Sequence, residues 1–192
     1  MEGPSAAGVE KKTVEEARAL LHSDECGVYL LPFVRSTWAR KGHPPVLREQ
    51  CGYEHMSVIA AISSSGNLVY DLREGTYDGD GVGCFLKTLT YHYRKQRMVM
   101  VWDGAAIHRC RQVKEFLASS AGKIHLEYFP AYSPEFNATE LLWGWLKGRL
   151  ANRIFTTLSE LRAGIVEELE SAKNNRSLIR SFFRHPELCL FL

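Results

Sequence analysis

The sequence predicts an α/β fold in which a mixed central sheet carries helices on both faces. Three observations lead to this prediction. Strand-like segments come first, strand-like and helix-like segments alternate in the middle, and the end of the chain has helical periodicity. The length of 192 residues suits one domain with a substantial core, and 45% hydrophobic with 24% charged residues is the composition of an ordinary soluble globular protein.

The first part of the chain is expected to contain a short helix at 12–22, followed by extended segments. In ECGVYLL (25–31), β-branched, aromatic and aliphatic residues lead up to Pro32, where the strand ends. VRSTWAR (34–40) is expected to form a second short strand, and a Ser/Gly/Asn turn at 63–67 joins two further strands into a hairpin. These two strands are expected at 56–62 and 68–73.

The middle of the chain alternates between helix and strand. MVMVW (98–102) is entirely apolar, which fits a central strand that is buried on both faces. The other expected elements are a strand at 124–129 and helices at 79–93, 108–120, 138–151, 158–173 and 177–184. Three antiparallel strands followed by αβαβα is the element order of the ribonuclease H-like fold, which we therefore predict.

Charge is informative through its distribution. The net charge of +2 is weak evidence for a nucleic-acid partner, but basic residues gather in clusters that could each contact phosphates or simply face solvent. The clusters are Arg35/Arg40/Lys41/Arg48, Arg94/Lys95/Arg97, Arg109/Arg111/Lys114 and Lys147/Arg149/Arg153.

Cysteine content and apolar run length indicate a cytoplasmic protein. The five cysteines are scattered and form no C-x-x-C pair, which argues against a disulfide framework and a structural zinc site. The N-terminus has no apolar signal core, and no stretch approaches the ~18 apolar residues that span a membrane.

Three carboxylates occupy positions where metal-dependent phosphodiester chemistry needs them. Asp24 opens the first expected strand, Asp103 ends the most apolar strand, and Glu140 lies in the first turn of the helix after Pro134. Ligands of open α/β sheets gather at the carboxyl ends of strands. Mg²⁺ takes oxygen ligands and keeps several waters, so a few carboxylates from separate elements suffice for a two-ion site.

Several motifs resemble those of the DDE transposases of the mariner superfamily, in particular its bacterial insertion-sequence branch. The resemblance lies in VWDGAAIH (101–108) and FPAYSPEFNATELLWGWLK (129–147), together with Asp24-Glu25 and the TWARKGHPP segment (37–45). It covers about residues 22–153, and the spacing of the second and third motifs is specific.

This resemblance implies a ribonuclease H-like catalytic domain that cleaves and joins DNA at transposon ends with two Mg²⁺ (or Mn²⁺) ions. Asp24 and Asp103 are then expected to bridge or flank the ions, and Glu140 completes the site. It also implies DNA as the partner, a homodimer as the active assembly, insertion at TA, and a helix-turn-helix module that is separate or missing. A bacterial cytoplasm, with the protein on the nucleoid when bound to DNA, is the expected location.

The chain departs from the family pattern near two of the three acids. Gly104 stands where the family commonly has Asn, Ala138 where it commonly has Pro, and Glu135-Phe136 where Asp-Leu is commoner. None of these departures removes a carboxylate, so the implied metal ligands are all present.

Each acid also has a structural interpretation. Asn137-Ala-Thr-Glu140 fits a capping box, and a Glu that reaches back to its N-cap cannot freely coordinate an ion. Asp103 could cap the turn that follows it, and Asp24 could be a surface acid. Glu25 alternates to the strand face opposite Asp24 and is not expected to be a ligand. The rival acids are Asp71, Asp78 and Asp80, and capping the next helix is the expected role of the last two.

Six residues are candidates for contacting DNA, each with surface exposure or core packing as the alternative. They are Trp38, Arg40, Lys41, His108, Arg109 and Lys147. The expected organisation is a lead-in helix over 1–22, a catalytic domain over 23–155 and a helical extension over 156–192 packed on the same domain. Two other functions share these features, namely a ribonuclease H-like nuclease that does not transpose and a non-catalytic DNA-binding remnant.

Overall fold

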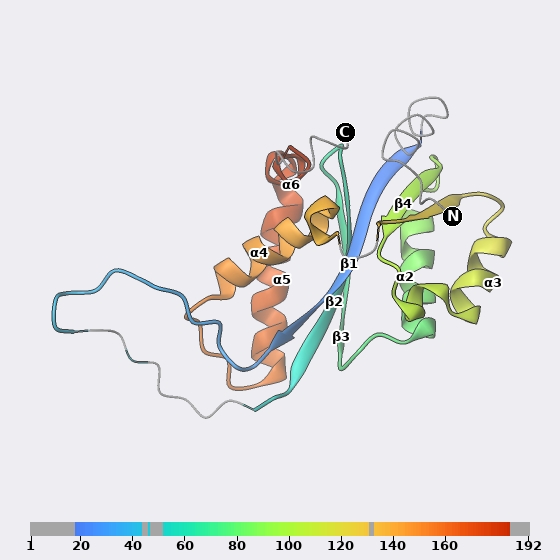
Figure 1. Cartoon of the computed structure of the whole chain (residues 1–192). Coiled ribbons are helices and arrows are strands. Elements are labelled where there is room, and N and C mark those ends of the chain that lie inside the picture. The colour runs from blue at the N-terminus through green and yellow to red at the C-terminus, as the bar shows by residue number, and fades with distance from the viewer. Residues whose placement is uncertain (1–17, 44–45, 47–51, 131–132, 185–192) are drawn as a thin grey trace.

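A five-stranded mixed sheet forms the centre of the computed structural model, which describes residues 18–43, 46, 52–130 and 133–184 (Figure 1). The strand order is β3-β2-β1-β4-β5. The strands are β1 (Ala19–Tyr29), β2 (His55–Ser63), β3 (Leu68–Glu74), β4 (Met98–Trp102) and β5 (Ile124–Tyr128). The pairs β1–β2 and β2–β3 are antiparallel, whereas β4 and β5 run parallel to β1. This is the predicted order of elements.

The first strand is longer than the sequence indicated. It begins at Ala19, so the helix expected over 12–22 is wrong for residues 18–22, and residues 12–17 lie outside the described part of the chain. Ala19–His22 pair in parallel with Met98–Val101 of β4, and Leu21 also pairs with Ser63 of β2. Pairing on both sides overrides the helical pattern of this segment. Asp24 therefore lies inside β1 rather than at its start.

The strand expected over 34–40 is also wrong, because this segment pairs with none of the strands in the described part of the chain. Residues 30–43 leave β1 as an extended loop that runs away from the sheet (Figure 1), and Val34 and Trp38 are exposed. Near its start the loop is held by Asn152, whose side chain accepts from the Arg35 N–H and donates to the Arg35 carbonyl. A side chain thus supplies the hydrogen bonds that a strand partner supplies in a sheet.

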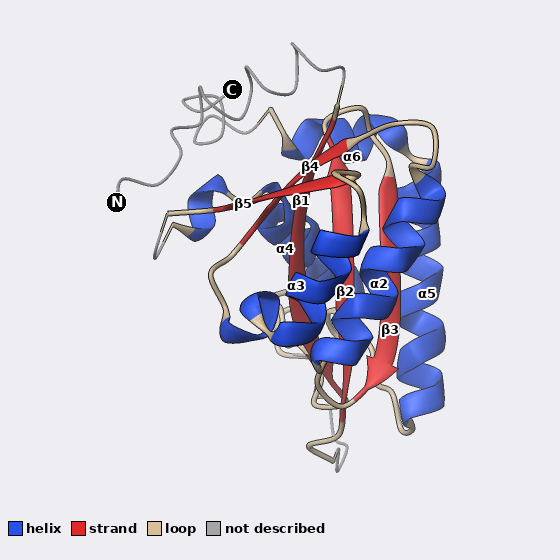
Figure 2. Ribbon diagram, turned by 90° about the vertical axis from the view of Figure 1, so that its right-hand side faces the viewer, coloured by secondary structure: helices blue, strands red, loops and turns tan. Residues whose placement is uncertain are grey.

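Helices cover both faces of the sheet, as predicted (Figures 1 and 2). One face carries α2 (Gly79–His92) and α3 (Arg111–Ser119), and the other carries α4 (Ala138–Leu150), α5 (Leu158–Asn174) and α6 (Arg176–Phe182). Two short 3₁₀ turns, η1 (Ala106–Arg109) and η2 (Pro134–Phe136), precede α3 and α4. The helix expected over 108–120 is therefore divided into η1 and α3. No described helix has the length and apolar character needed to cross a membrane.

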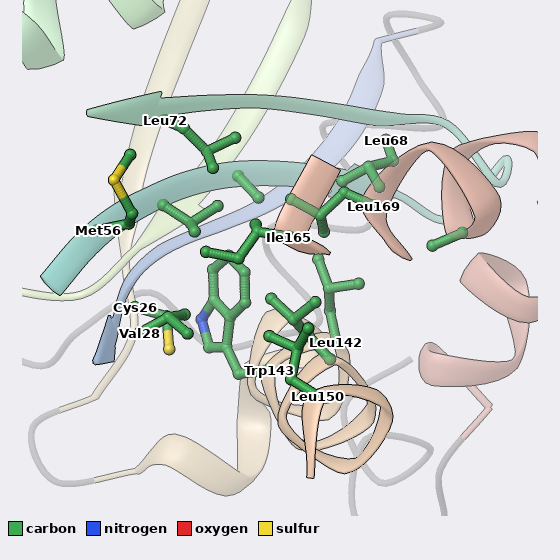
Figure 3. Packing of buried hydrophobic residues seen from close by; sticks show 14 of the residues in the cluster. Cys26, Val28, Met56, Leu68, Leu72, Leu142, Trp143, Leu150, Ile165 and Leu169 are labelled. Carbon is green, nitrogen blue, oxygen red and sulfur yellow. The ribbon is translucent and has the colours of Figure 1, made fainter. Parts of the chain in front are cut away.

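The larger core lies between the sheet and α4, α5 and α6. Trp143 of α4 is almost completely buried and lies near Cys26 and Val28 of β1, with Ile165 of α5 beside it (Figure 3). Burial of an aromatic side chain of this size removes a large apolar area from water, so α4 is firmly fixed against β1. This packing holds the first turn of α4, which carries Glu140, over the strand that carries Asp24.

Candidate active site

Asp24 lies on the β1 face that packs against α4. Successive side chains of a strand alternate between faces, so Asp24 shares its face with Cys26 and Val28 of the larger core. Its Oδ2 accepts hydrogen bonds from Asn137 Nδ2 (3.2 Å) and Trp143 Nε1 (3.3 Å), and its Oδ1 accepts from the Glu25 N–H (2.9 Å). The N-cap and the second turn of α4 therefore orient this carboxylate.

Asp24 lies in a partly buried site with other acids nearby. Burial, together with the charges of Glu140, Glu25 and Asp103, raises the pKa of its carboxyl to about 7, against the opposing effect of the backbone hydrogen bond from Glu25. Glu140 and Asp103, the other two acids predicted to form the site, are thus close enough to Asp24 to affect its pKa.

Asp103 follows β4 directly and is half exposed. Its Oδ1 accepts from the Ala105 N–H (3.0 Å) and forms an ion pair with His108 Nδ1 (2.6 Å). The hydrogen bond from His108 holds the pKa of Asp103 below its usual value, and burial opposes this effect. Asp103 therefore accepts from the residue just before η1, but η1 has Ala105 as its N-cap and no side-chain cap, so the interpretation of Asp103 as a cap is not realised. The ion pair with His108 is a contact that the sequence did not suggest.

His108 is completely buried between two carboxylates. Its Nε2 lies 3.0 and 3.1 Å from the two carboxylate oxygens of Glu25, and its ring stacks on Trp102 with the centroids 3.8 Å apart. Burial lowers the pKa of the imidazole, but the hydrogen bonds and charges of Asp103 and Glu25 outweigh it and raise the pKa to about 9. As a buried ion-pair partner, His108 is not placed to contact DNA directly.

Glu140 is exposed in the first turn of α4. Asn137 caps this helix by accepting from the Thr139 N–H (3.1 Å), as the sequence predicted. Within the described residues, the Glu140 side chain makes no hydrogen bond, so it does not reach back to the N-cap. The capping box is thus formed only in part, because the Glu140 side chain takes no part in it. The Glu140 carboxylate is therefore free of the helix cap and can bind a metal ion.

The first N–H of α4 is satisfied by a histidine from β1. His22 Nδ1 accepts from the Ala138 N–H (3.1 Å), and both residues are buried. Burial lowers the pKa of His22 to about 3, so the ring is neutral at pH 7 and can accept at Nδ1. The ring also makes edge contacts with Phe129 and Phe183. His22 therefore joins the start of α4 to the strand that carries Asp24.

The chemistry of the three acids suits a hard divalent cation. Their oxygens are the ligands that Mg²⁺ and Mn²⁺ prefer, and the charges of Glu140, Glu25 and Asp103, which add to the effect of burial on the pKa of Asp24, are ones that a cation would offset. Over residues 18–43, 46, 52–130 and 133–184, no three His, Cys, Asp or Glu side chains are grouped closely enough to hold one ion together. Any ion here would take fewer protein ligands and complete its shell with water, as Mg²⁺ commonly does.

The basic candidates for DNA contact fall into two groups. Lys147 and Arg109 lie near the acids: Lys147 is close enough to Cys26 to affect its pKa, and the Arg109 guanidinium lies 4.7 Å from the centre of the Tyr128 ring. The positive charge of Arg109 contributes to the lowered pKa of Asp103. In contrast, Trp38, Arg40 and Lys41 are exposed on the loop that runs away from the sheet (Figure 1).

The rival acids have structural roles. Asp78 is the N-cap of α2, where it accepts from the Gly81 N–H (2.8 Å) and pairs with Arg73. Asp71 accepts from the Tyr77 hydroxyl. Asp80 lies in the first turn of α2, where a negative charge favours the helix. The capping role predicted for Asp78 is confirmed, whereas Asp80 follows the cap.

Sequence reasoning missed the residues that hold the acids in place. Glu25 does lie on the opposite face from Asp24, but there it binds His108. Trp143 packs in the larger core, and its indole N–H also donates to Asp24. The partners of these contacts are 83 and 119 residues apart along the chain, so no local pattern could have shown them.

Comparisons with known proteins show the family of this chain. The family model described as DDE superfamily endonuclease matches residues 19–162. The Tc3 transposase of Caenorhabditis elegans is 32% identical over 94 residues, covering 47% of this chain and 28% of the relative. An uncharacterized 39 kDa protein of insertion element IS630 from Shigella sonnei is 24% identical over 136 residues, covering 69% and 39%. The chain therefore spans well under half the length of these relatives.

Solved structures show the same fold. The Mos1 mariner paired end complex with Mn matches with a TM-score of 0.70 at 17% identity, covering 97% of this chain and 60% of that one. The catalytic domain of Mos1 mariner transposase matches with a TM-score of 0.64 at 14% identity, covering 97% and 89%. The ribonuclease H-like fold and the family resemblance predicted from the sequence are thus confirmed.

Proposed function

We propose that this chain, which belongs to the DDE superfamily endonuclease family, is the catalytic domain of a transposase that cuts DNA and joins the freed 3′ end to a target. One observation carries the proposal: Asp24 of β1 is held by the N-cap and second turn of α4, and the charges of Glu140 in the first turn of α4 and of Asp103 after β4 both act on its carboxyl. Three acids from separate elements, in a family of endonucleases, support a shared catalytic site.

Asp24, Asp103 and Glu140 are the proposed ligands of two divalent ions, Mg²⁺ or Mn²⁺. Several Mos1 structures with the same fold carry Mg or Mn in their names, which supports the choice of metal. When bound, such ions activate the attacking oxygen and stabilise the leaving oxygen. Asn137 and Trp143 hold Asp24 toward the site, and the exposed carboxylate of Glu140 approaches from α4.

DNA is the proposed substrate, at transposon ends and at the target. Arg109 and Lys147 are placed to meet phosphates near the acids, whereas Trp38, Arg40 and Lys41 offer contacts farther along the loop. We further propose a homodimer as the active assembly, with end recognition by a helix-turn-helix module outside these residues. The setting is a bacterial cytoplasm, with the protein on the nucleoid. Residues 23–155 form the catalytic domain, and the later helices extend it.

The test is a cleavage and strand-transfer assay with Mg²⁺ or Mn²⁺ on duplex DNA that carries transposon ends. Asp24→Asn, Asp103→Asn and Glu140→Gln are each expected to abolish both products, because each removes a negative charge from a proposed metal ligand while the shape is kept. Asp80→Asn is the matched control, since this exposed acid lies on α2 and contributes no charge to the site. Unchanged activity in any of the first three variants contradicts the assignment.

The same assay separates the alternative functions. A nuclease that does not transpose gives cleavage products that depend on the three acids but never join to a target. A non-catalytic remnant binds DNA and gives neither product. The transposase proposal is favoured over a remnant because all three acids are retained and the charges of Glu140 and Asp103 both act on Asp24.

A further inference from the structure

His108 has both of its ring nitrogens engaged by acceptors. Nδ1 lies 2.6 Å from Asp103 Oδ1 and 3.3 Å from the Asp103 carbonyl oxygen, whereas Nε2 faces both carboxylate oxygens of Glu25. Carboxylate and carbonyl oxygens only accept hydrogen bonds, so each nitrogen must carry a proton. The buried ring is therefore an imidazolium that joins an acid on β1 to the acid after β4.

The two oxygens of Asp103 have different surroundings. Oδ1 receives both the Ala105 N–H and the His108 ring. No hydrogen bond reaches Oδ2 from any residue that the structure describes. With one oxygen held from two directions, rotation of the carboxylate is restricted and the second oxygen keeps a fixed direction.

We propose that His108 and Glu25 are positioning residues for Asp103: they hold Oδ1 so that Oδ2 is the oxygen presented to a divalent ion. This inference rests on the proposed function. Glu25 acts through His108, because it fixes the ring from the opposite side, and Trp102 sets the plane of the ring by stacking on it. Neighbours that orient a ligating side chain in this way commonly change metal affinity by about 10–100-fold when they are removed.

A matched pair of variants distinguishes the role of Nδ1 from the role of Nε2. The amide nitrogen of His108→Asn takes the place of Nδ1, so this variant keeps a donor for Asp103. The longer His108→Gln places its amide nitrogen near the position of Nε2, so it keeps a donor for Glu25 and loses the one for Asp103. Both variants remove the stacking on Trp102, so they share the structural cost.

The readout is the Mn²⁺ affinity of the whole chain without DNA, measured from the electron paramagnetic resonance signal of free Mn²⁺. His108→Gln is expected to weaken binding about tenfold or more, whereas His108→Asn, which keeps the donor for Asp103 and loses only the contact with Glu25, is expected to weaken it less. Glu25→Gln is expected to weaken binding in the wild-type background but not in His108→Gln, since the link to Asp103 is already broken there. His125→Gln is the control, because this histidine lies on β5 beside Glu127.

Urea unfolding of the metal-free proteins shows whether the effect is only structural. If both His108 variants weaken Mn²⁺ binding equally, in step with their loss of stability, or if both bind as the wild type does, the positioning role is wrong. If the wild type binds no Mn²⁺, or if Asp103→Asn binds it equally well, the proposed metal site is wrong, and this inference fails with it. A lower Mn²⁺ affinity of His108→Gln than of His108→Asn supports the positioning role.

Discussion

Replacing His22 by Phe is expected to destabilise the domain through a single lost hydrogen bond. The imidazole Nδ1 is the acceptor for the buried Ala138 N–H, at 3.1 Å. Phe keeps an aromatic ring against Phe129 and Phe183 but has no acceptor. The first N–H of α4 is then buried without a partner, and this N–H belongs to the helix turn that carries Glu140.

An unsatisfied buried N–H costs about 1–3 kcal/mol. Taking about 2 kcal/mol for His22→Phe, the midpoint of thermal unfolding should fall by about 4–8 °C in a chain of this size. The assay is unfolding at pH 7.5, by heat and by urea, followed by circular dichroism. His92→Phe is the control, because this ring is exposed and such surface changes usually stay within about 0.5 kcal/mol. If His22→Phe has the same thermal midpoint and the same free energy of unfolding as the wild type, the hydrogen bond does not hold α4, and the prediction is wrong.

Two further predictions concern a helix cap and a neighbour of the site. Thr156 donates to the Glu160 carboxylate from its N–H and its hydroxyl, which lowers the pKa of Glu160. Because the pKa of Glu160 is lower in the folded state, its ionised carboxylate stabilises the fold above the ordinary pKa of about 4.5. The difference in free energy of unfolding between wild type and Glu160→Gln, measured by urea titration, should therefore become smaller as the pH falls below about 4.5. A difference independent of pH would contradict this. A Cβ at Gly104 would lie 2.8 Å from Arg109 Nη2, so Gly104→Asn should displace this flexible side chain, keep stability, and reduce the salt slope of DNA binding by about one in fluorescence anisotropy. An unchanged slope would mean that Arg109 meets no phosphate.

The sequence predicted most of the fold because local patterns and tertiary packing agree over most of the chain. MVMVW forms the buried β4, and Asn137 caps α4 as its side chain indicated. Agreement fails where the partner is distant. Residues 19–22 have a helical pattern, but each pairs with a residue of β4 that lies 79 positions farther along the chain. Residues 34–40 have strand propensity, but no strand among the residues that the structure describes lies beside them, and propensity alone does not form a sheet.

The candidate site was predictable in its acids but not in their support. Asp103 follows an all-apolar strand, and this pattern indicates a ligand at the carboxyl end of a sheet. The positions of His108 and Glu25 depend on the pairing of β1 with β4 and on the η1 turn, which brings His108 back over Trp102. A helical wheel for 108–120 would have missed this contact, because η1 and α3 are separate elements.

Asp24 and Glu25 are neighbours in β1, and they make contacts on opposite faces of the sheet. Neighbouring residues of a strand point to opposite faces, so Asp24 meets Asn137 and Trp143 on the α4 side, whereas Glu25 meets His108 on the α2 side. A slip of β1 by one residue would exchange the two acids and break both sets of contacts. The long antiparallel pairing of β1 with β2, from Leu21 to Tyr29, opposes such a slip. The length of β1 beyond the expected strand therefore serves the site directly, because it fixes which acid faces which helix layer.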